Sequence, residues 1–179
     1  HVVWLDVKHY LANQRQGTAK SKERAEVRRS TKKLLRQKGS GGARHGSAKA
    51  PIYVGGGRVF GPRPRNYDFK LNKKIKSLAR MSVLSARAKE GKIVVVEDFA
   101  YETPKTKNYI TFLNNLNLGN SKTLFVVDGT SNNLYLSARN IPKTKVSEKD
   151  SVNTYDLINA ETILLAESTI SHLETILKD

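Results

Sequence analysis

The sequence has no cysteine among its 179 residues. Disulfides and thiolate metal sites are therefore excluded, and a reducing compartment such as the cytoplasm fits this composition. The four histidines (His1, His9, His45 and His172) lie far apart without the spacing of metal ligands, so we expect no metal site. No apolar run approaches the ~20 residues that a bilayer-spanning helix needs, and we therefore expect no membrane partner.

Acidic residues are missing from one long stretch, because no Asp or Glu occurs between Glu26 and Asp68. Residues 1–80 carry 21 Lys and Arg but only 4 Asp and Glu, whereas residues 81–179 carry 11 and 12. The formal net charge of +16 thus comes from the first 80 residues. A surplus of this size predicts a polyanionic partner.

The segment from about residue 14 to residue 67 also lacks any sustained hydrophobic period, and it holds most of the glycines and prolines. Such a segment buries too little apolar surface to offset its ordering entropy on its own. Long structureless segments inside compact domains are uncommon unless they are functional. We therefore predict an extended, basic, glycine-rich internal loop that is held by a ligand, with RNA as the first candidate.

The remaining sequence is typical of alternating helices and strands. Residues 1–13 predict an amphipathic helix whose apolar face is Val3, Val7, Tyr10 and Leu11, with Trp4 beside it. Residues 71–89 predict a helix that ends at Gly91. Its expected inward row is Leu71, Ile75, Leu78, Ser82 and Ala86.

The apolar runs at 92–96, 122–128 and 162–165 predict short strands, and a further strand is expected near 145–146. The first run is wholly apolar, which is typical of a strand buried on both faces. Helices are expected after residue 103, over 133–139 and 154–160, and at the C-terminus. The inward residues expected of the two longer helices are Ile110, Leu113 and Leu116, and Ile170, Leu173, Ile176 and Leu177.

This order indicates an α/β fold, which is a mostly parallel sheet with helices on both faces. We expect one discontinuous globular domain, residues 1–13 and 68–179, with residues 14–67 as an RNA-binding loop.

Catalytic and nucleotide-binding readings have weak support. Gly41–Ser47 has the glycine spacing of a phosphate loop but lacks its Lys and Ser/Thr, and no strand precedes it. Glu97, Asp98 and Asp128 follow strands, where α/β active sites form, but no nucleophile or histidine accompanies them. We interpret them as capping or solvated acids and expect no catalytic residue and no cofactor.

The basic segment favours RNA binding, because arginine matches phosphate oxygens, glycine allows close approach, and aromatic rings such as Tyr53, Phe60 and Tyr67 can stack on bases. The helix after the loop extends the basic surface. The expected RNA-binding residues are Arg15, Lys20, Lys22, Arg24, Arg28, Arg29, Lys32, Lys33, Arg36, Lys38, Arg44, His45, Lys49, Arg58, Arg63, Arg65, Lys73, Lys74 and Lys76.

An ordered series of motifs resembles the bacterial large-subunit ribosomal protein L-four family. The motifs are Arg15-Gln16-Gly17-Thr18, Arg36-Gln37-Lys38-Gly39-Ser40-Gly41, Ala43-Arg44-His45-Gly46-Ser47, Ala50-Pro51-Ile52, Gly55-Gly56-Gly57, Gly61-Pro62-Arg63-Pro64-Arg65, Asn72-Lys73-Lys74, the strand ending at Glu97, Pro104-Lys105-Thr106-Lys107 and Leu136-Ser137-Ala138-Arg139-Asn140. They extend over nearly the whole chain.

The resemblance implies a structural constituent of the large ribosomal subunit in the cytoplasm. Its partners would be large-subunit ribosomal RNA, neighbouring ribosomal proteins and the nascent peptide, because the family's loop tip lines the peptide exit tunnel. The residues that match the tip are Arg36, Gln37, Lys38, Gly39, Gly41 and Arg44.

Two features depart from the family pattern. Lys33-Leu34-Leu35 stands where the family often has Lys-Pro-Trp, and the family's N-terminal segment with its first strand is absent before His1. We therefore expect a missing element or a truncated N-terminus. The alternatives are an α/β RNA-modifying enzyme with a basic docking loop and a free regulatory RNA-binding protein.

Overall fold

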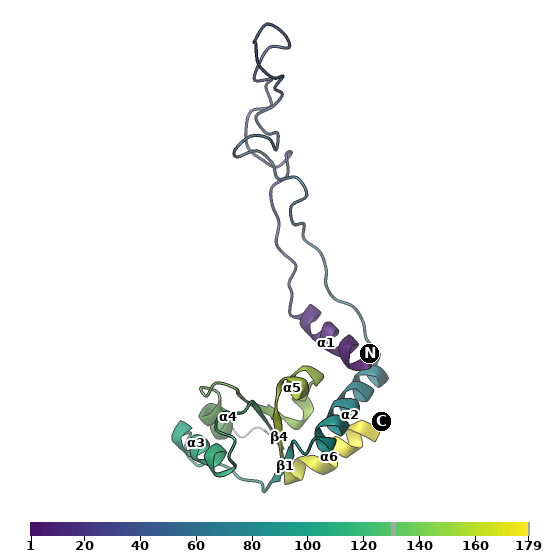
Figure 1. Ribbon diagram of the computed structural model, residues 1–179, viewed down its shortest axis with the longest axis vertical. Coiled ribbons are helices and arrows are strands. Elements are labelled where there is room, and N and C mark those ends of the chain that lie inside the picture. The colour runs from purple at the N-terminus through teal and green to yellow at the C-terminus, as the bar shows by residue number, and fades with distance from the viewer. Residues whose placement is uncertain (130–131, 179) are drawn as a thin grey trace. The chain divides into compact units, whose positions relative to one another are not determined.

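The computed structural model describes residues 1–129 and 132–178, and the side chains of residues 176–178 lie outside this description. Two compact units make up the chain. The globular unit consists of His1–Ala12 and Phe69–Asp179, and the loop unit consists of Asn13–Asp68 (Figure 1).

The globular unit is an α/β fold. Its helices and strands are α1 (Val2–Asn13, ending in the loop unit), α2 (Lys73–Lys89), β1 (Ile93–Val96), α3 (Thr106–Asn115), β2 (Thr123–Val127), α4 (Asn132–Ala138), β3 (Thr144–Glu148), the 3-10 helix η1 (Lys149–Ser151), α5 (Thr154–Asn159), β4 (Thr162–Ala166) and α6 (Glu167–Lys178). The four strands form an all-parallel sheet in the order β1-β4-β2-β3.

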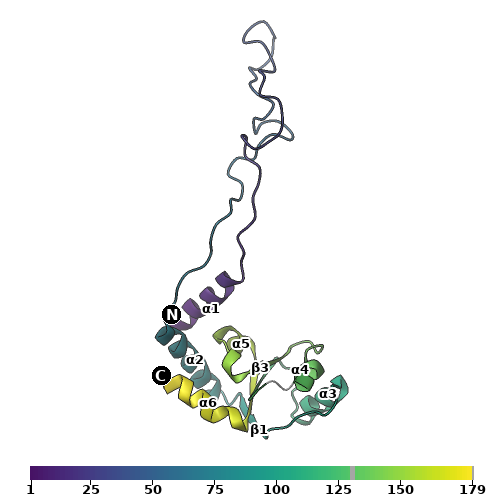
Figure 2. The ribbon, with the colours of Figure 1, turned by 180° about the vertical axis from the view of Figure 1, so that it is seen from behind.

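Helices cover both faces of the sheet, as the sequence predicts (Figures 1 and 2). On one face α2, α5 and α6 enclose a core that contains Val83, Leu157 and Leu173. On the other face α3 and α4 enclose a second core around Tyr109 and Phe125. Alternate residues of β2 and β4 point into each core, which is the period-two pattern of a strand.

The prediction that the first strand is buried on both faces is wrong. β1 lies at an edge of the sheet, and its Val95 side chain is 55% exposed. β2 shows the expected burial, because all five of its residues are buried between two neighbours. Apolar composition identifies a strand, but the strand order decides which strand is central.

Several expected helix faces are also wrong. In α2 the buried residues are Ala79 and Val83, while Leu78 is 51% exposed. In α3 the expected inward residues Leu113 and Leu116 do pack in the core, but Ile110 is exposed and Tyr109 is buried instead. Each residue turns the side-chain direction by about 100°, so an error of one position turns the inferred face outward.

Helix α1 contacts the core through Val3, as expected, but Leu11 is exposed. Its one buried residue is Asp6, which accepts a hydrogen bond from the buried hydroxyl of Thr154 in α5. The Tyr10 ring stacks on Tyr155 with centroids 5.2 Å apart. A polar pair and a ring stack therefore attach α1 to α5.

The loop unit consists of two extended arms joined by backbone hydrogen bonds. The amide of Arg65 donates to the carbonyl of Gly17 at 3.1 Å, and the amide of Arg58 donates to Lys22 at 2.9 Å. Nearer the middle of the segment, Gly57 donates to Lys49 at 3.0 Å. These bonds explain how a segment with so few apolar contacts holds a defined path.

Candidate nucleic-acid interface

The base of the loop unit is closed by an arginine–tyrosine–arginine stack. The guanidinium of Arg15 lies 3.8 Å from the centroid of the Tyr67 ring, and that of Arg65 lies 4.5 Å from it. Arg15 also donates a hydrogen bond of 3.0 Å to the Tyr67 hydroxyl. Gly17 permits this approach, because its φ is +68° and a Cβ there would lie 2.0 Å from the Arg65 carbonyl oxygen.

These contacts lower the pKa of Tyr67. A hydrogen bond from Arg65 is the largest cause, and the positive charge of Arg15 and Arg65 adds to it. The phenolate is favoured beside two guanidinium groups for the same reason that a phosphate would be. The base of the loop is therefore an anion-attracting environment.

Two carboxylates lie further along the first arm. Glu23 accepts an ion pair from Nε of Arg63 at 2.6 Å, which joins the two arms. Glu26 pairs with Lys20, and this hydrogen bond is the largest cause of its lowered pKa. Glu23 thus ties the first arm to the second, whereas Glu26 makes its contacts within the first arm.

Close backbone contact explains two of the glycines in the second arm. A Cβ on Gly57 would lie 2.3 Å from the amide nitrogen of Arg24, and one on Gly56 would lie 2.0 Å from the Ala50 carbonyl oxygen. A larger residue at position 57 would force the arms apart, and one at position 56 would open the turn within the second arm.

Some expected RNA-binding side chains are engaged within the loop unit. Arg29 donates 2.6 Å to the carbonyl of Val54 and 3.5 Å to that of Ala48, so its guanidinium braces a turn. His45 packs against Tyr53 with ring centroids 5.5 Å apart. The Nδ1 of His45 and the hydroxyl of Tyr53 are buried without a hydrogen-bond partner among the described residues.

The tip is a closed turn. Lys33 and Ser47 form an antiparallel bridge, and the amide of Leu34 donates to the Gly46 carbonyl at 3.0 Å. All six residues that match the family's tip fall between these closing pairs, and Gly39 and Gly41 have positive φ values of 80° and 67°. Arg36, Lys38 and Arg44 have no acidic partner among the residues that the structure describes.

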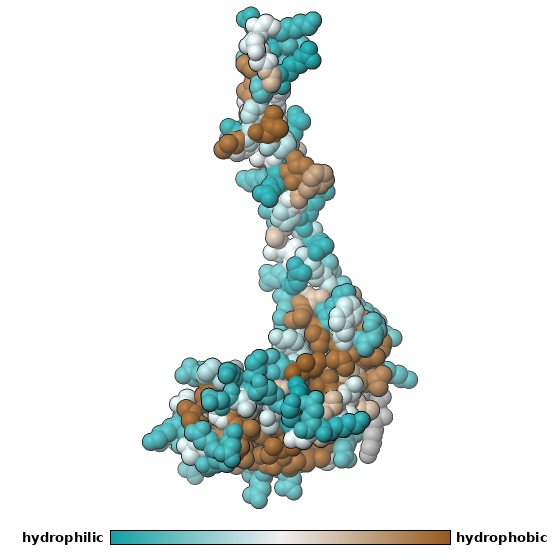
Figure 3. Space-filling model, in the orientation of Figure 1, coloured by the Kyte–Doolittle hydropathy of each residue, from teal (hydrophilic) through white to brown (hydrophobic). Residues whose placement is uncertain are grey.

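Of the three aromatic rings expected to stack on bases, two are engaged with protein groups. Tyr67 lies between two arginines, and Tyr53 packs on His45. Phe60 is fully exposed, at 103%, with a positive φ of 54°, and shares a surface hollow with Arg58 and Arg63. In Figure 3 the loop unit is mostly hydrophilic with scattered hydrophobic side chains.

The remaining expected basic residues lie on exposed or half-buried parts of the chain. Lys73 and Lys74 are exposed at the start of α2, and Lys76 is half-buried there. Exposed loop residues with no acidic partner within ion-pair distance among the described part of the chain are Lys22, Arg24, Arg28, Lys32, Lys33 and Arg58. Lys49 is half-buried.

Of the acids that follow the strands, Asp98 caps a helix, as the sequence predicts, and Asp128 forms an ion pair. Asp98 accepts hydrogen bonds from the amide of Ser168 at 3.1 Å and from its hydroxyl at 2.8 Å, at the start of α6. Asp128 pairs with Lys149 at 2.7 Å and thereby raises the pKa of that lysine. Both carboxylates are thus engaged in structural contacts.

Two general features of the described residues bear on the site. They contain no cluster of three or more His, Asp or Glu side chains that could hold a metal ion. No helix in this part of the chain is long and apolar enough to cross a membrane.

Comparison with known proteins gives one family. The profile of the Ribosomal protein L4/L1 family matches residues 1–176. "Large ribosomal subunit protein uL4" of Cytophaga hutchinsonii is 55% identical over 177 residues, which are 99% of this chain and 85% of that protein. The protein of the same name from Parabacteroides distasonis is 58% identical over 174 residues, covering 97% of this chain and 83% of that protein. The chain therefore belongs to the ribosomal protein L4/L1 family.

Proposed function

We propose that the chain is a structural constituent of the large ribosomal subunit that binds and braces large-subunit ribosomal RNA. The observation that carries this proposal is the loop unit, in which basic side chains line two arms tied by backbone hydrogen bonds and end in a closed basic tip. Each phosphate that such a surface neutralises releases counterions and adds affinity. The family and the names of its members support the same conclusion.

The two parts of the loop unit have different proposed roles. The arms, residues 14–32 and 48–67, bind RNA backbone, while the tip residues Arg36, Gln37, Lys38, Gly39, Gly41 and Arg44 line the exit tunnel and face the nascent peptide. The tip suits a tunnel wall because its positive-φ glycines make a tight turn without bulky side chains. Neighbouring ribosomal proteins are further proposed partners in the cytoplasmic ribosome.

The proposed work is structural and not catalytic. An RNA-modifying enzyme would need reactive groups after the strands, but Asp98 caps α6 and Asp128 is paired with Lys149. A free regulatory protein would not require stable attachment to the subunit, and sedimentation separates these cases.

The experiment is sedimentation of the tagged chain through a sucrose gradient at moderate salt. We expect one copy per large subunit, and we expect deletion of residues 39–61 to weaken this attachment. A matched charge variant, R36A/K38A/R44A, should stay bound, because its arms are intact. If the intact chain remains at the top of the gradient, the ribosomal proposal is wrong.

A further inference from the structure

The globular unit carries a row of lysines at the end of its sheet where the strands begin, and we call this end the lysine edge. Lys92, Lys122 and Lys143 are the residues directly before β1, β2 and β3. All strands of the described sheet are parallel, so their first residues lie at the same edge. The fourth strand, β4, is preceded by Glu161.

Backbone hydrogen bonds join each of these lysines to the neighbouring strand. The amide of Thr123 donates to Lys143 at 2.9 Å, that of Glu161 to Lys122 at 2.8 Å, and that of Ile163 to Lys92 at 2.9 Å. In the strand order β1-β4-β2-β3, Glu161 lies between Lys92 and Lys122, whereas Lys122 and Lys143 precede neighbouring strands. Neighbouring strands are about 4.8 Å apart, so the backbone positions of this row are fixed by the sheet. A side chain on such a rigid element has less freedom to lose on binding than one on a mobile loop.

Carboxylates gather at the opposite end of the sheet, where the strands finish, and we call this end the acidic edge. Glu97 follows β1, Asp128 follows β2, Glu148 ends β3 and Glu167 follows β4. Three of the four strands therefore run from a lysine to a carboxylate. Lys149 also lies at this acidic end, where it pairs with Asp128.

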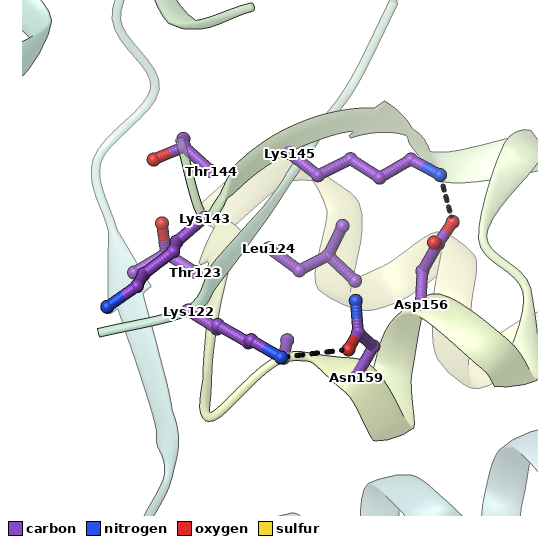
Figure 4. A pocket seen from close by; sticks show the side chains of 9 residues that line it. Lys122, Thr123, Leu124, Lys143, Thr144, Lys145, Asp156 and Asn159 are labelled. Atoms are coloured by element: carbon purple, nitrogen blue, oxygen red, sulfur yellow. Dashed lines mark hydrogen bonds and ion pairs between the residues drawn. The ribbon is translucent and has the colours of Figure 1, made fainter. Parts of the chain in front are cut away.

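Two lysines of the row are uncompensated. Figure 4 shows the shallow pocket at this edge, where Lys145 points to Asp156 and pairs with it at 2.5 Å. The Lys122 ammonium instead lies 3.4 Å from the neutral Oδ1 of Asn159, and that of Lys143 lies 3.2 Å from the Asn120 carbonyl oxygen. Neither of these two ammonium groups has a carboxylate within 4.0 Å among the described residues, although the Glu161 carboxylate accepts a hydrogen bond of 3.2 Å from the Lys122 backbone amide. The third lysine of the row, Lys92, pairs with Glu90 at 3.0 Å.

The backbone at Lys143 adds a second observation. Its φ is +66°, a left-handed conformation that glycine or asparagine adopts at lower cost. A lysine in such a position is not explained by local backbone preference. Outliers of this kind often mark a functional side chain.

We propose that this lysine edge binds RNA phosphates, as a contact separate from the loop unit, and that the acidic edge faces away from RNA. The inference rests on the proposed function and adds an orientation to it, because a polyanion attracts one edge and repels the other. RNA is favoured over an acidic protein because the proposed function places the chain in a ribosomal subunit, where RNA is the principal polyanion.

The first test measures affinity for transcribed large-subunit ribosomal RNA against salt concentration, using the whole chain. The variant K122Q/K143Q removes two edge charges, and K105Q/K107Q removes two exposed charges at the start of α3. Each lost phosphate contact lowers the log–log salt slope by roughly 0.7–0.9, so the edge variant should lose about 1.5 and the control nothing. Equal slopes in the two variants would overturn the edge proposal while leaving the proposed function intact.

The second test uses the absence of cysteine from the chain. A photo-crosslinker is attached through K143C at the lysine edge or through E97C at the acidic edge, and each labelled chain is assembled into large subunits. We expect RNA adducts from the first variant and few from the second. Equal RNA labelling, or adducts to protein from K143C, would contradict the proposal. Failure of the unaltered chain to bind RNA would instead contradict the proposed function.

Discussion

Arg15 and Tyr67 are 52 residues apart in sequence, yet the Arg15 guanidinium lies 3.8 Å from the centroid of the Tyr67 ring and donates to its hydroxyl. Arg65 lies against the same ring. One tyrosine thus joins the start and the end of the loop unit. The same contact holds Arg15 and Arg65, which are expected to bind RNA, in position before RNA is bound.

Replacing this ring should loosen the base of the loop. In Tyr67→Ala both cation–π contacts are lost, and we expect the Arg65 amide, which donates to Gly17, to exchange with solvent several-fold faster. Hydrogen exchange of the free chain measures this rate. Tyr67→Phe keeps the ring and should change it less, and Tyr53→Ala should leave it unchanged. Equal exchange in Tyr67→Ala and the unaltered chain would disprove the role of the ring.

The tyrosines should ionise in a defined order. Arg65 and Arg15 lower the pKa of Tyr67 below its ordinary 10.0, whereas burial raises the pKa values of Tyr101 and Tyr109 above it. Ultraviolet titration should therefore show an early phenolate phase that disappears in Tyr67→Phe. Since the neutral form of Tyr109 is favoured by folding, its contribution to stability is full below pH 10 and is lost as the pH rises further. An early phase that persists in Tyr67→Phe would be evidence against this assignment.

Phe60 should contribute to RNA affinity by stacking. Its side chain is fully exposed between Arg58 and Arg63, and base–aromatic stacking is worth about 1–3 kcal/mol. We expect Phe60→Ala to weaken ribosomal RNA binding about tenfold, and Phe60→Tyr to retain it. Ile52→Ala, at an exposed aliphatic position of the same loop, is the control. An equal loss in both alanine variants would mean that the aromatic ring has no special role.

Two glycines should respond differently to the same substitution. A methyl group on Gly57 would meet the backbone of Arg24 at 2.3 Å, whereas one on Gly42 meets nothing within 4 Å. We expect Gly57→Ala to displace the arms and weaken RNA binding about tenfold, while Gly42→Ala binds normally. Filter binding with both variants measures this, and similar affinities would show that the arms tolerate separation.

The Asp6–Thr154 pair should stabilise the globular unit. Both side chains are buried, so Thr154→Val leaves a carboxylate without its donor. Hydrogen bonds to charged groups are worth roughly 1.5–3 kcal/mol, and we expect a loss of about 2 kcal/mol in urea unfolding. Thr154→Ser retains the donor and should lose less. If the valine variant unfolds at the same urea concentration as the unaltered chain, the pair carries no net stability.

Much of the fold follows from the sequence, because strands with buried neighbours leave clear apolar runs. The run at 122–128 became β2, in which every residue is buried. The sequence predicted the buried faces of the helices less well, because in α2 Ala79 and not Leu78 packs inward. A small side chain lets α2 approach its neighbours closely, and nothing in the local pattern reveals that requirement.

The candidate site shows a similar division. Charge and glycine content predict an RNA-binding loop, and the structure adds that Lys33 and Ser47 close the turn containing the residues expected at its tip. The internal contacts of Arg29 and Tyr67 could not be predicted, because they depend on which distant backbone segments pair. The opposed charges at the sheet edges were also missed, although the lysine before each of three strands was visible in the sequence.

The position of the acids in the loop unit has a kinetic consequence. Glu23, Glu26 and Asp68 are its only carboxylates, and none lies in the stretch that contains the tip. Screening limits charge interactions to about 8–10 Å in physiological salt, so each part of the loop is felt separately by an approaching polyanion. Glu23 and Glu26 offset part of the charge of the first arm, but its seven basic residues leave it about as positive per residue as the tip. Diffusional encounter with unfolded RNA can therefore begin at the tip or at the arms.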